Sequence, residues 1–180
     1  MNSILYGLAG LLRIPSRVAE YIGTQRDKYA PLSVPLTKEQ NAGMADFFSP
    51  QLLASARVLV LEGSRIENPS FYRLLAKVRF LELPDVSQSA ATTFYDVIVS
   101  HEPFSAGLLF HELVHVEQYR QLGIKRFSEL YVRGLLQCGG YDGIPLEVNA
   151  YVLGGEFECD PAGSFSVEEE VANWVREGKF

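Results

Sequence analysis

The chain has 180 residues, of which 47% are hydrophobic and 12% aromatic, so it can bury the core of one ordinary domain. Its formal net charge is −6 and it contains no run of basic residues. Because phosphate binding needs clustered Lys and Arg, this composition argues against nucleic acid as the main partner.

The N-terminal segment 3–23 has the apolar periodicity of a helix, broken or kinked near Pro15. Its apolar run 4–12 is too short to span a bilayer, has no Lys or Arg before it and lacks a clear cleavage site. We therefore expect no stable membrane span, and a buried or partner-facing amphipathic helix is favoured over a signal peptide. Segment 27–36 contains two prolines and is typical of a connecting loop, which could block or line a site.

The middle of the chain alternates helical and strand patterns. Thr37 followed by Gln40 is a capping-box pattern and predicts a helix over 37–48. Residues 57–63 alternate and are rich in Val and Leu, which predicts a strand. Segment 69–80 fits a helix or a strand, and its initial proline favours a helix.

The strongest strand pattern, residues 92–100, is β-branched and aromatic and has no glycine or proline. Four helical patterns follow it, over 105–122, 126–138, 145–157 and 166–178. Glycines mark the ends of three of them, and a capping-box pair, Ser166 and Glu169, marks the start of the last. A strand followed by four helices predicts an α+β fold rather than alternating α/β. We expect one domain over 1–180, with an N-terminal helical extension (1–36), a core (37–157) and a C-terminal helix (158–180).

The only two cysteines, Cys138 and Cys159, lie at the two ends of a predicted helix of roughly 20 Å. A disulfide across such an element is geometrically awkward, so both are expected to be free thiols. Free thiols favour a reducing compartment, and we expect a cytoplasmic protein without excluding secretion.

The segment "LLFHELVHVEQYR" (108–120) contains two of the three histidines, four residues apart, with a glutamate directly after the first. On a helix, His111 and His115 lie on one face about 6 Å apart and can both bind one zinc ion. Glu112 lies about 100° round the helix, so it flanks the metal and can accept a proton from a zinc-bound water.

The rest of this helix is apolar on two faces, which predicts that it is buried on most sides. The strip formed by His111, His115 and Tyr119 therefore needs a polar partner. The alternative is two partly exposed histidines that hydrogen-bond nearby carbonyls. The third histidine, His101, follows strand 92–100, and there an ordinary loop role is favoured over substrate contact.

The segment resembles the active-site helix of the zinc metallopeptidases called zincins, which want uncharged residues around the motif. Leu109, Leu113, Val114 and Val116 comply, whereas Glu117 departs. The metzincin pattern requires a third histidine at the position of Gln121 and so fails. "HELVHVEQYRQLG" followed by "IPLEVNAY" is instead similar to small, poorly characterised bacterial gluzincin-like proteins, over roughly residues 92–157.

The gluzincin resemblance implies that a glutamate from a following helix is the third zinc ligand. Glu147 is the first candidate, and small Ala150 and Gly154 on its face would let the two helices come close. Asp142 and then Glu156 are the alternatives. Zincins often stabilise the oxyanion with a Tyr or His; Tyr151 is the candidate here, with Tyr119 and Tyr141 as competitors.

The combined expectation is a small zincin-like domain in which a short mixed or antiparallel sheet packs on the active-site helix. It would be a zinc-dependent hydrolase, most simply a peptidase, with Glu112 as general base and a peptide or protein as substrate. The edge of strand 92–100 could bind an extended peptide. Two alternatives stay open: a non-catalytic, zinc-stabilised scaffold, and a module whose site opens when a partner docks on the N-terminal helices.

Overall fold

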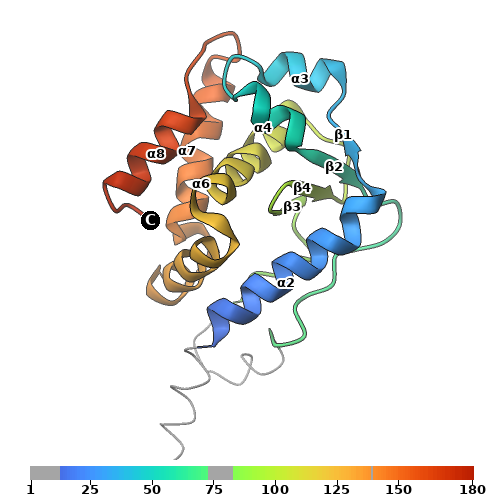
Figure 1. Ribbon diagram of the computed structural model, residues 1–180, viewed down its shortest axis with the longest axis vertical. Coiled ribbons are helices and arrows are strands. Elements are labelled where there is room, and N and C mark those ends of the chain that lie inside the picture. The colour runs from blue at the N-terminus through green and yellow to red at the C-terminus, as the bar shows by residue number, and fades with distance from the viewer. Residues whose placement is uncertain (1–12, 73–82, 139) are drawn as a thin grey trace, which may run out of the picture.

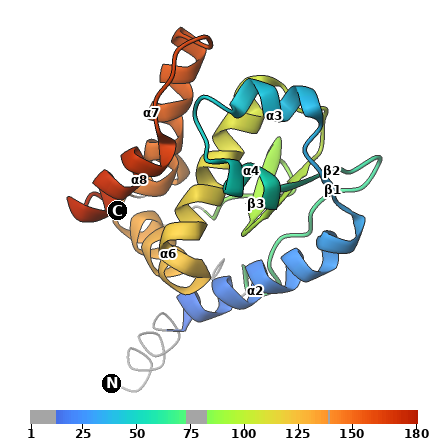
Figure 2. The same ribbon diagram turned by 45° about the horizontal axis from the view of Figure 1, so that its top comes forward.

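The structure is a computed structural model that describes residues 13–72, 83–138 and 140–180. In these ranges, six α-helices pack around one four-stranded mixed sheet, which confirms the predicted α+β class (Figure 1). The long helix α6 (Ala106–Cys138) runs through the middle. The sheet and α2 (Ile14–Tyr29) lie on one side of it, and α7 (Pro145–Cys159) and α8 (Val167–Arg176) lie on the other (Figure 2).

The sheet has the strand order β1-β2-β4-β3, with β2 parallel to β4 and the other neighbours antiparallel. Its strands are β1 (Val34–Pro35), β2 (Arg57–Val60), β3 (Ala91–Phe94) and β4 (Val97–Ser100). The predicted strand over 57–63 is confirmed as β2, although it ends at Val60. Strand β3 lies at one edge of the sheet and packs against α6.

The prediction of one continuous strand over 92–100 is wrong, because this segment is a β-hairpin. Phe94 pairs with Val97, so Tyr95 and Asp96 form a two-residue turn. Tyr95 has a φ of 64°, a left-handed conformation that a bulky residue rarely adopts, and the sequence therefore carries no turn signal. Arg26 on α2 holds the turn from outside, through hydrogen bonds of 2.9 and 3.0 Å to the Asp96 carboxylate.

The N-terminal helix differs from its expected bounds. Residues 1–12, including the apolar run, lie outside the described residues, and α2 begins at Ile14 with Pro15 in its first turn. It continues to Tyr29, so the first three residues of the expected loop 27–36 are helical. A short 3₁₀ turn, η1 (Ala30–Leu32), and β1 follow.

Two short helices precede β2. Helix α3 (Lys38–Met44) confirms the Thr37–Gln40 capping box, and it ends four residues before the predicted boundary. Helix α4 (Pro50–Ser55), capped by the Ser49 side chain, was not predicted, since six residues are too few to show periodicity. Most of the segment 69–80, for which a helix was favoured, lies outside the described residues.

The helices predicted after the hairpin are confirmed. In α6, Gly123 (φ 69°, ψ 160°) separates two helical pieces, as expected from a helix-ending glycine. A 3₁₀ turn, η2 (Tyr141–Gly143), leads into α7, and Ser166 caps the first turn of α8 by accepting a hydrogen bond from the Glu169 amide. Both cysteines are free, as predicted, and both are exposed.

Tight packing fixes α6 against its neighbours. Phe110 is fully buried and stacks on Phe157 of α7, with ring centroids 4.5 Å apart. A Cβ at Gly134 would lie 2.7 Å from Cδ of Pro145, so this glycine lets the start of α7 approach α6. The sequence predicts this close approach at Ala150 and Gly154. Ala150 is indeed buried, but a Cβ at Gly154 would meet nothing within 4 Å.

Glu117, the residue that departs from the zincin pattern, has a structural role. Its side chain is only 1% exposed and accepts two hydrogen bonds from Arg120, at 2.7 and 3.0 Å. Arg120 also forms a 2.6 Å ion pair with Glu168 of α8, so a buried carboxylate at this position ties α8 to α6.

Candidate metal centre

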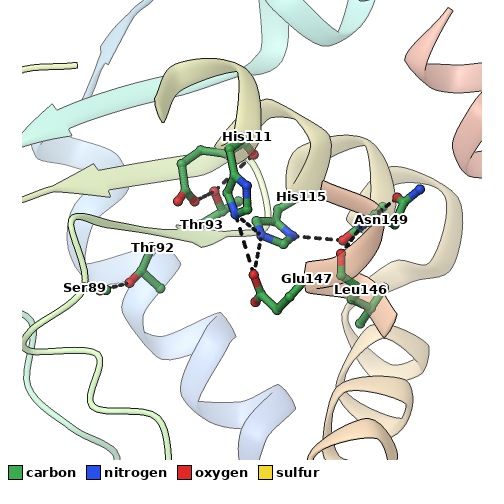
Figure 3. Close-up of polar contacts among 10 residues, drawn as sticks. Ser89, Thr92, Thr93, His111, His115, Leu146, Glu147 and Asn149 are labelled. Carbon is green, nitrogen blue, oxygen red and sulfur yellow. Dashed lines mark hydrogen bonds and ion pairs between the residues drawn. The ribbon is translucent and has the colours of Figure 1, made fainter. Parts of the chain in front are cut away.

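Three side chains from two helices converge beside β3. One donor atom from each of His111, His115 and Glu147 lies within 4.8 Å of the other two (Figure 3). Both histidine Nε2 atoms face the Glu147 Oε2 atom, at 3.6 Å from His111 and 3.3 Å from His115, and they are 3.1 Å from each other. These three residues could hold a metal ion.

Local structure explains this convergence. His111 and His115 stack on one face of α6 because they are four residues apart. Glu147 lies in the first turn of α7, which Pro145 begins and which packs beside α6 at Gly134. The alternative third ligands, Asp142 and Glu156, are both exposed and are not part of the group.

The chemistry of the group fits a cation. The Glu147 side chain is 4% exposed, and within the described residues its Oε2 atom makes no hydrogen bond, although the Nε2 atoms of both histidines face it. A buried carboxylate oxygen without a partner is unfavourable, and coordination of a metal would satisfy it. Two imidazole nitrogens and one carboxylate are a usual three-residue set for catalytic zinc.

The charges of His115 and Glu147 also favour binding of a cation by this group. Burial opposes a charge on His115, but the neighbouring Glu147 carboxylate outweighs it and raises the pKa of His115 to about 9. Burial also opposes the charge on Glu147, yet His115 and the side chains of His111 and Tyr141 hold the pKa of Glu147 well below its usual range. The carboxylate therefore stabilises a positive charge at this point, as a proton on His115 or as a metal ion.

Glu112 is buried and opens on the same cavity as the three ligands. Its Oε2 atom accepts a 2.6 Å hydrogen bond from the hydroxyl of Thr93 on β3. This contact fixes the direction of the carboxylate. Thr93 was missed in the sequence, because it lies 19 residues before Glu112 and no motif connects the two.

A second missed residue is Gln118, which is fully buried on α6 one turn after His115. Its side chain contacts Nδ1 of His115 at 2.9 Å and reaches the first turn of α7. An uncharged polar residue on an otherwise buried helix, three positions after a predicted ligand, is the signal that could have revealed it.

The candidate oxyanion residues differ in exposure. Tyr151 is 53% exposed, and its ring centroid lies 4.7 Å from that of His111. Tyr119 is buried and stacks on Phe127, at 3.8 Å between centroids. Burial, followed by the charge of Glu147, raises the pKa of Tyr119, Tyr141 and Tyr151, so these phenols stay protonated and able to donate.

His101 is engaged away from this centre. Its Nε2 accepts a 3.0 Å hydrogen bond from the Ile66 amide, and its Nδ1 lies 2.7 Å from the Ser89 carbonyl. Through these two contacts the His101 ring joins two loops, in agreement with the expected loop role.

The group of His111, His115 and Glu147 opens on a cavity of about 840 Å³. Segments from α2, β3, α6 and α7 line it, including four residues of α2: Ile14, Val18, Tyr21 and Ile22. None of the described residues found to line it comes from the segment 27–36, so α2 rather than the loop that follows it contributes to the wall.

In the described part of the chain, none of the helices combines the length and apolar character needed to cross a membrane. The chain matches no protein-family model, no curated protein and no solved structure.

Proposed function

We propose that the protein is a zinc-dependent hydrolase that cleaves peptides, with zinc held by His111, His115 and Glu147. This proposal rests mainly on one observation: the partly buried His111 and the buried His115 and Glu147 open on one cavity together with the buried Glu112, and within the described residues one Glu147 carboxylate oxygen makes no hydrogen bond. A zinc ion in such a site polarises a carbonyl group and lowers the pKa of a water molecule to near 7.

Glu112 is the general base of the proposed reaction. Its carboxylate takes a proton from the attacking water, whose oxygen bonds to the substrate carbonyl carbon. The same residue then passes this proton to the leaving nitrogen as the carbon–nitrogen bond breaks. The hydroxyl of Thr93, 2.6 Å from Oε2 of Glu112, keeps the carboxylate in place between the two steps.

The edge of β3 supports a peptide as substrate. The His101 amide donates to the Ala90 carbonyl, and hydrogen-bonded pairs alternate along the antiparallel β3–β4 ladder. The backbone groups of Ala91 and Thr93 therefore face away from β4. Both residues line the cavity, so an extended peptide could pair with this edge beside the metal.

The cavity also helps to choose between a hydrolase and the alternative of a non-catalytic scaffold, which would have a metal site but no usable cleft. A space of about 840 Å³ at the ligand group favours a hydrolase over such a scaffold. Helix α2 forms one wall of this space, so its position decides how a long substrate can enter.

The test is cleavage of an unbiased peptide library by zinc-loaded protein. Glu112→Gln should keep zinc and lose roughly 10²- to 10⁴-fold in rate, because an amide cannot accept the proton. Glu156→Gln is the matched control, since Glu156 is an exposed glutamate of α7 outside the ligand group. Equal cleavage by wild type and Glu112→Gln, with zinc bound in both, would contradict the proposed mechanism.

A further inference from the structure

Gln118 links the two helices that carry the metal ligands. Its Oε1 atom lies 2.9 Å from Nδ1 of His115. Its Nε2 atom donates two hydrogen bonds, each of 2.9 Å, to the Leu146 carbonyl and to Oδ1 of Asn149, both on α7. The side chain is fully buried, so no water competes for these contacts. Figure 3 shows Leu146 and Asn149 beside His115 and Glu147.

The Leu146 carbonyl determines which end of the Gln118 amide faces α7 and which end faces His115. The Leu146 carbonyl can only accept, so the NH₂ end of the Gln118 amide must point to it. The oxygen end then faces His115, and the 2.9 Å contact requires a proton on Nδ1 of that ring. With its proton on Nδ1, a neutral His115 leaves the lone pair of Nε2 directed toward His111 and Glu147.

The same side chain also holds the third ligand. The Leu146 carbonyl belongs to the peptide group that joins Leu146 to Glu147. Gln118 therefore fixes the backbone just before Glu147, although the two contact partners are 28 positions apart in the chain.

We propose that Gln118 is a positioning residue of the metal centre, which sets the tautomer of His115 and aligns the first turn of α7 so that Glu147 meets both histidines. The inference rests on the metal site of the proposed function and is independent of hydrolysis. A ligand set prepared in this way binds metal more tightly than one whose rings and backbone must first be ordered.

The test compares three variants by titration with Zn²⁺ against a competing chelator. Gln118→Leu removes both ends of the link and should weaken zinc binding about 10- to 100-fold. Gln118→Glu keeps an oxygen acceptor for Nδ1–H of His115 but loses the donor to the Leu146 carbonyl, so its affinity should lie between those of wild type and Gln118→Leu. Gln137→Leu, the same substitution at an exposed glutamine of α6, is the matched control and should leave the affinity unchanged.

A second measurement reports the tautomer directly. Nitrogen-15 NMR of the zinc-loaded wild type should show His115 protonated at Nδ1, with slow exchange of that proton. The exchange should quicken in Gln118→Leu and stay slow in Gln118→Glu. A purely structural role would change thermal stability in the variants without changing this signal, and the wild-type spectrum remains informative even if Gln118→Leu does not fold.

The outcomes separate this inference from the proposed function. A wild-type protein that takes up no zinc would overturn the metal site and this inference with it. Zinc binding by the wild type together with unchanged affinity in folded Gln118→Leu, or with an Nδ1 proton of His115 that exchanges as fast in wild type as in Gln118→Leu, would overturn only the role of Gln118.

Discussion

The hydroxyl of Thr93 on β3 donates a 2.6 Å hydrogen bond to the carboxylate of Glu112 on α6, and both side chains are buried. This contact joins the edge strand of the sheet to the proposed base. Thr93 holds the proposed base in position but is outside the proposed set of metal ligands. The effect of Thr93 on catalysis can therefore be measured separately from any effect on metal binding.

Thr93→Val should lower the peptide-cleavage rate about 10- to 100-fold, since a hydrogen bond to a charged group contributes roughly 1.5–3 kcal/mol. Zinc content, measured by elemental analysis, should not change. Thr92→Val is the control, because in the described part of the chain the Thr92 hydroxyl hydrogen-bonds to the Ser89 hydroxyl, at 3.0 Å, and not to Glu112. Equal losses in the two variants would show that Thr93 acts through general stability of the strand.

Glu147→Ala should abolish stoichiometric zinc binding, whereas Asp142→Ala should leave it unchanged. The reason is that Glu147 supplies an oxygen 3.3 Å from Nε2 of His115, while Asp142 is exposed on η2. The measurement is zinc per chain after dialysis, with about one ion expected in wild type. Loss of zinc in Asp142→Ala alone would move the third ligand to that residue.

Removal of the metal should destabilise the fold, because an ion that binds only the native state adds to its stability. At a free zinc concentration 100 times the dissociation constant, the loss is about 2.7 kcal/mol, or roughly 5–10 °C in melting temperature for a chain of this size. His111→Ala provides the comparison, since its melting curve should not respond to chelator. Coinciding wild-type curves with and without chelator would speak against metal binding at these packed helices.

Gly134→Ala should destabilise the protein and weaken zinc binding together. The added Cβ would lie 2.7 Å from the Pro145 ring, so the start of α7, and Glu147 with it, must shift. Overpacking of this kind typically costs about 1–3 kcal/mol in the free energy of unfolding. Gly23→Ala is the control, because a Cβ there meets nothing within 4 Å, and a mid-helix alanine is favoured over glycine by about 0.5–1 kcal/mol. Urea unfolding and zinc titration of both variants would check the prediction.

Phe110→Ala should lower the free energy of unfolding by about 3–5 kcal/mol, the usual effect of truncating a buried aromatic residue. Phe110 is fully buried between α6 and α7, where its ring stacks on Phe157 at 4.5 Å. Chemical denaturation measures the change. Val175→Ala, at an exposed position of α8, should change stability much less.

The sequence predicted what local interactions determine. The i, i+4 spacing of His111 and His115 placed both rings on one helix face, and the glycine at position 123 ended the first piece of α6. The Thr37–Gln40 capping box was readable because its partners are three residues apart. Glu147 was predicted as a third ligand only through a resemblance, and the structure places its carboxylate beside both histidines.

Only the tertiary structure revealed the contacts between segments far apart in the chain. Tyr95 turns the hairpin without a glycine, held by an ion pair between Arg26 and Asp96 that spans 70 positions. Thr93 reaches Glu112, and Gln118 reaches Leu146, through packing of β3 and α7 against α6. Residue spacing fixes which side chains share a face of one helix, but the partner of that face depends on how whole elements pack, a choice set by the summed burial of many side chains.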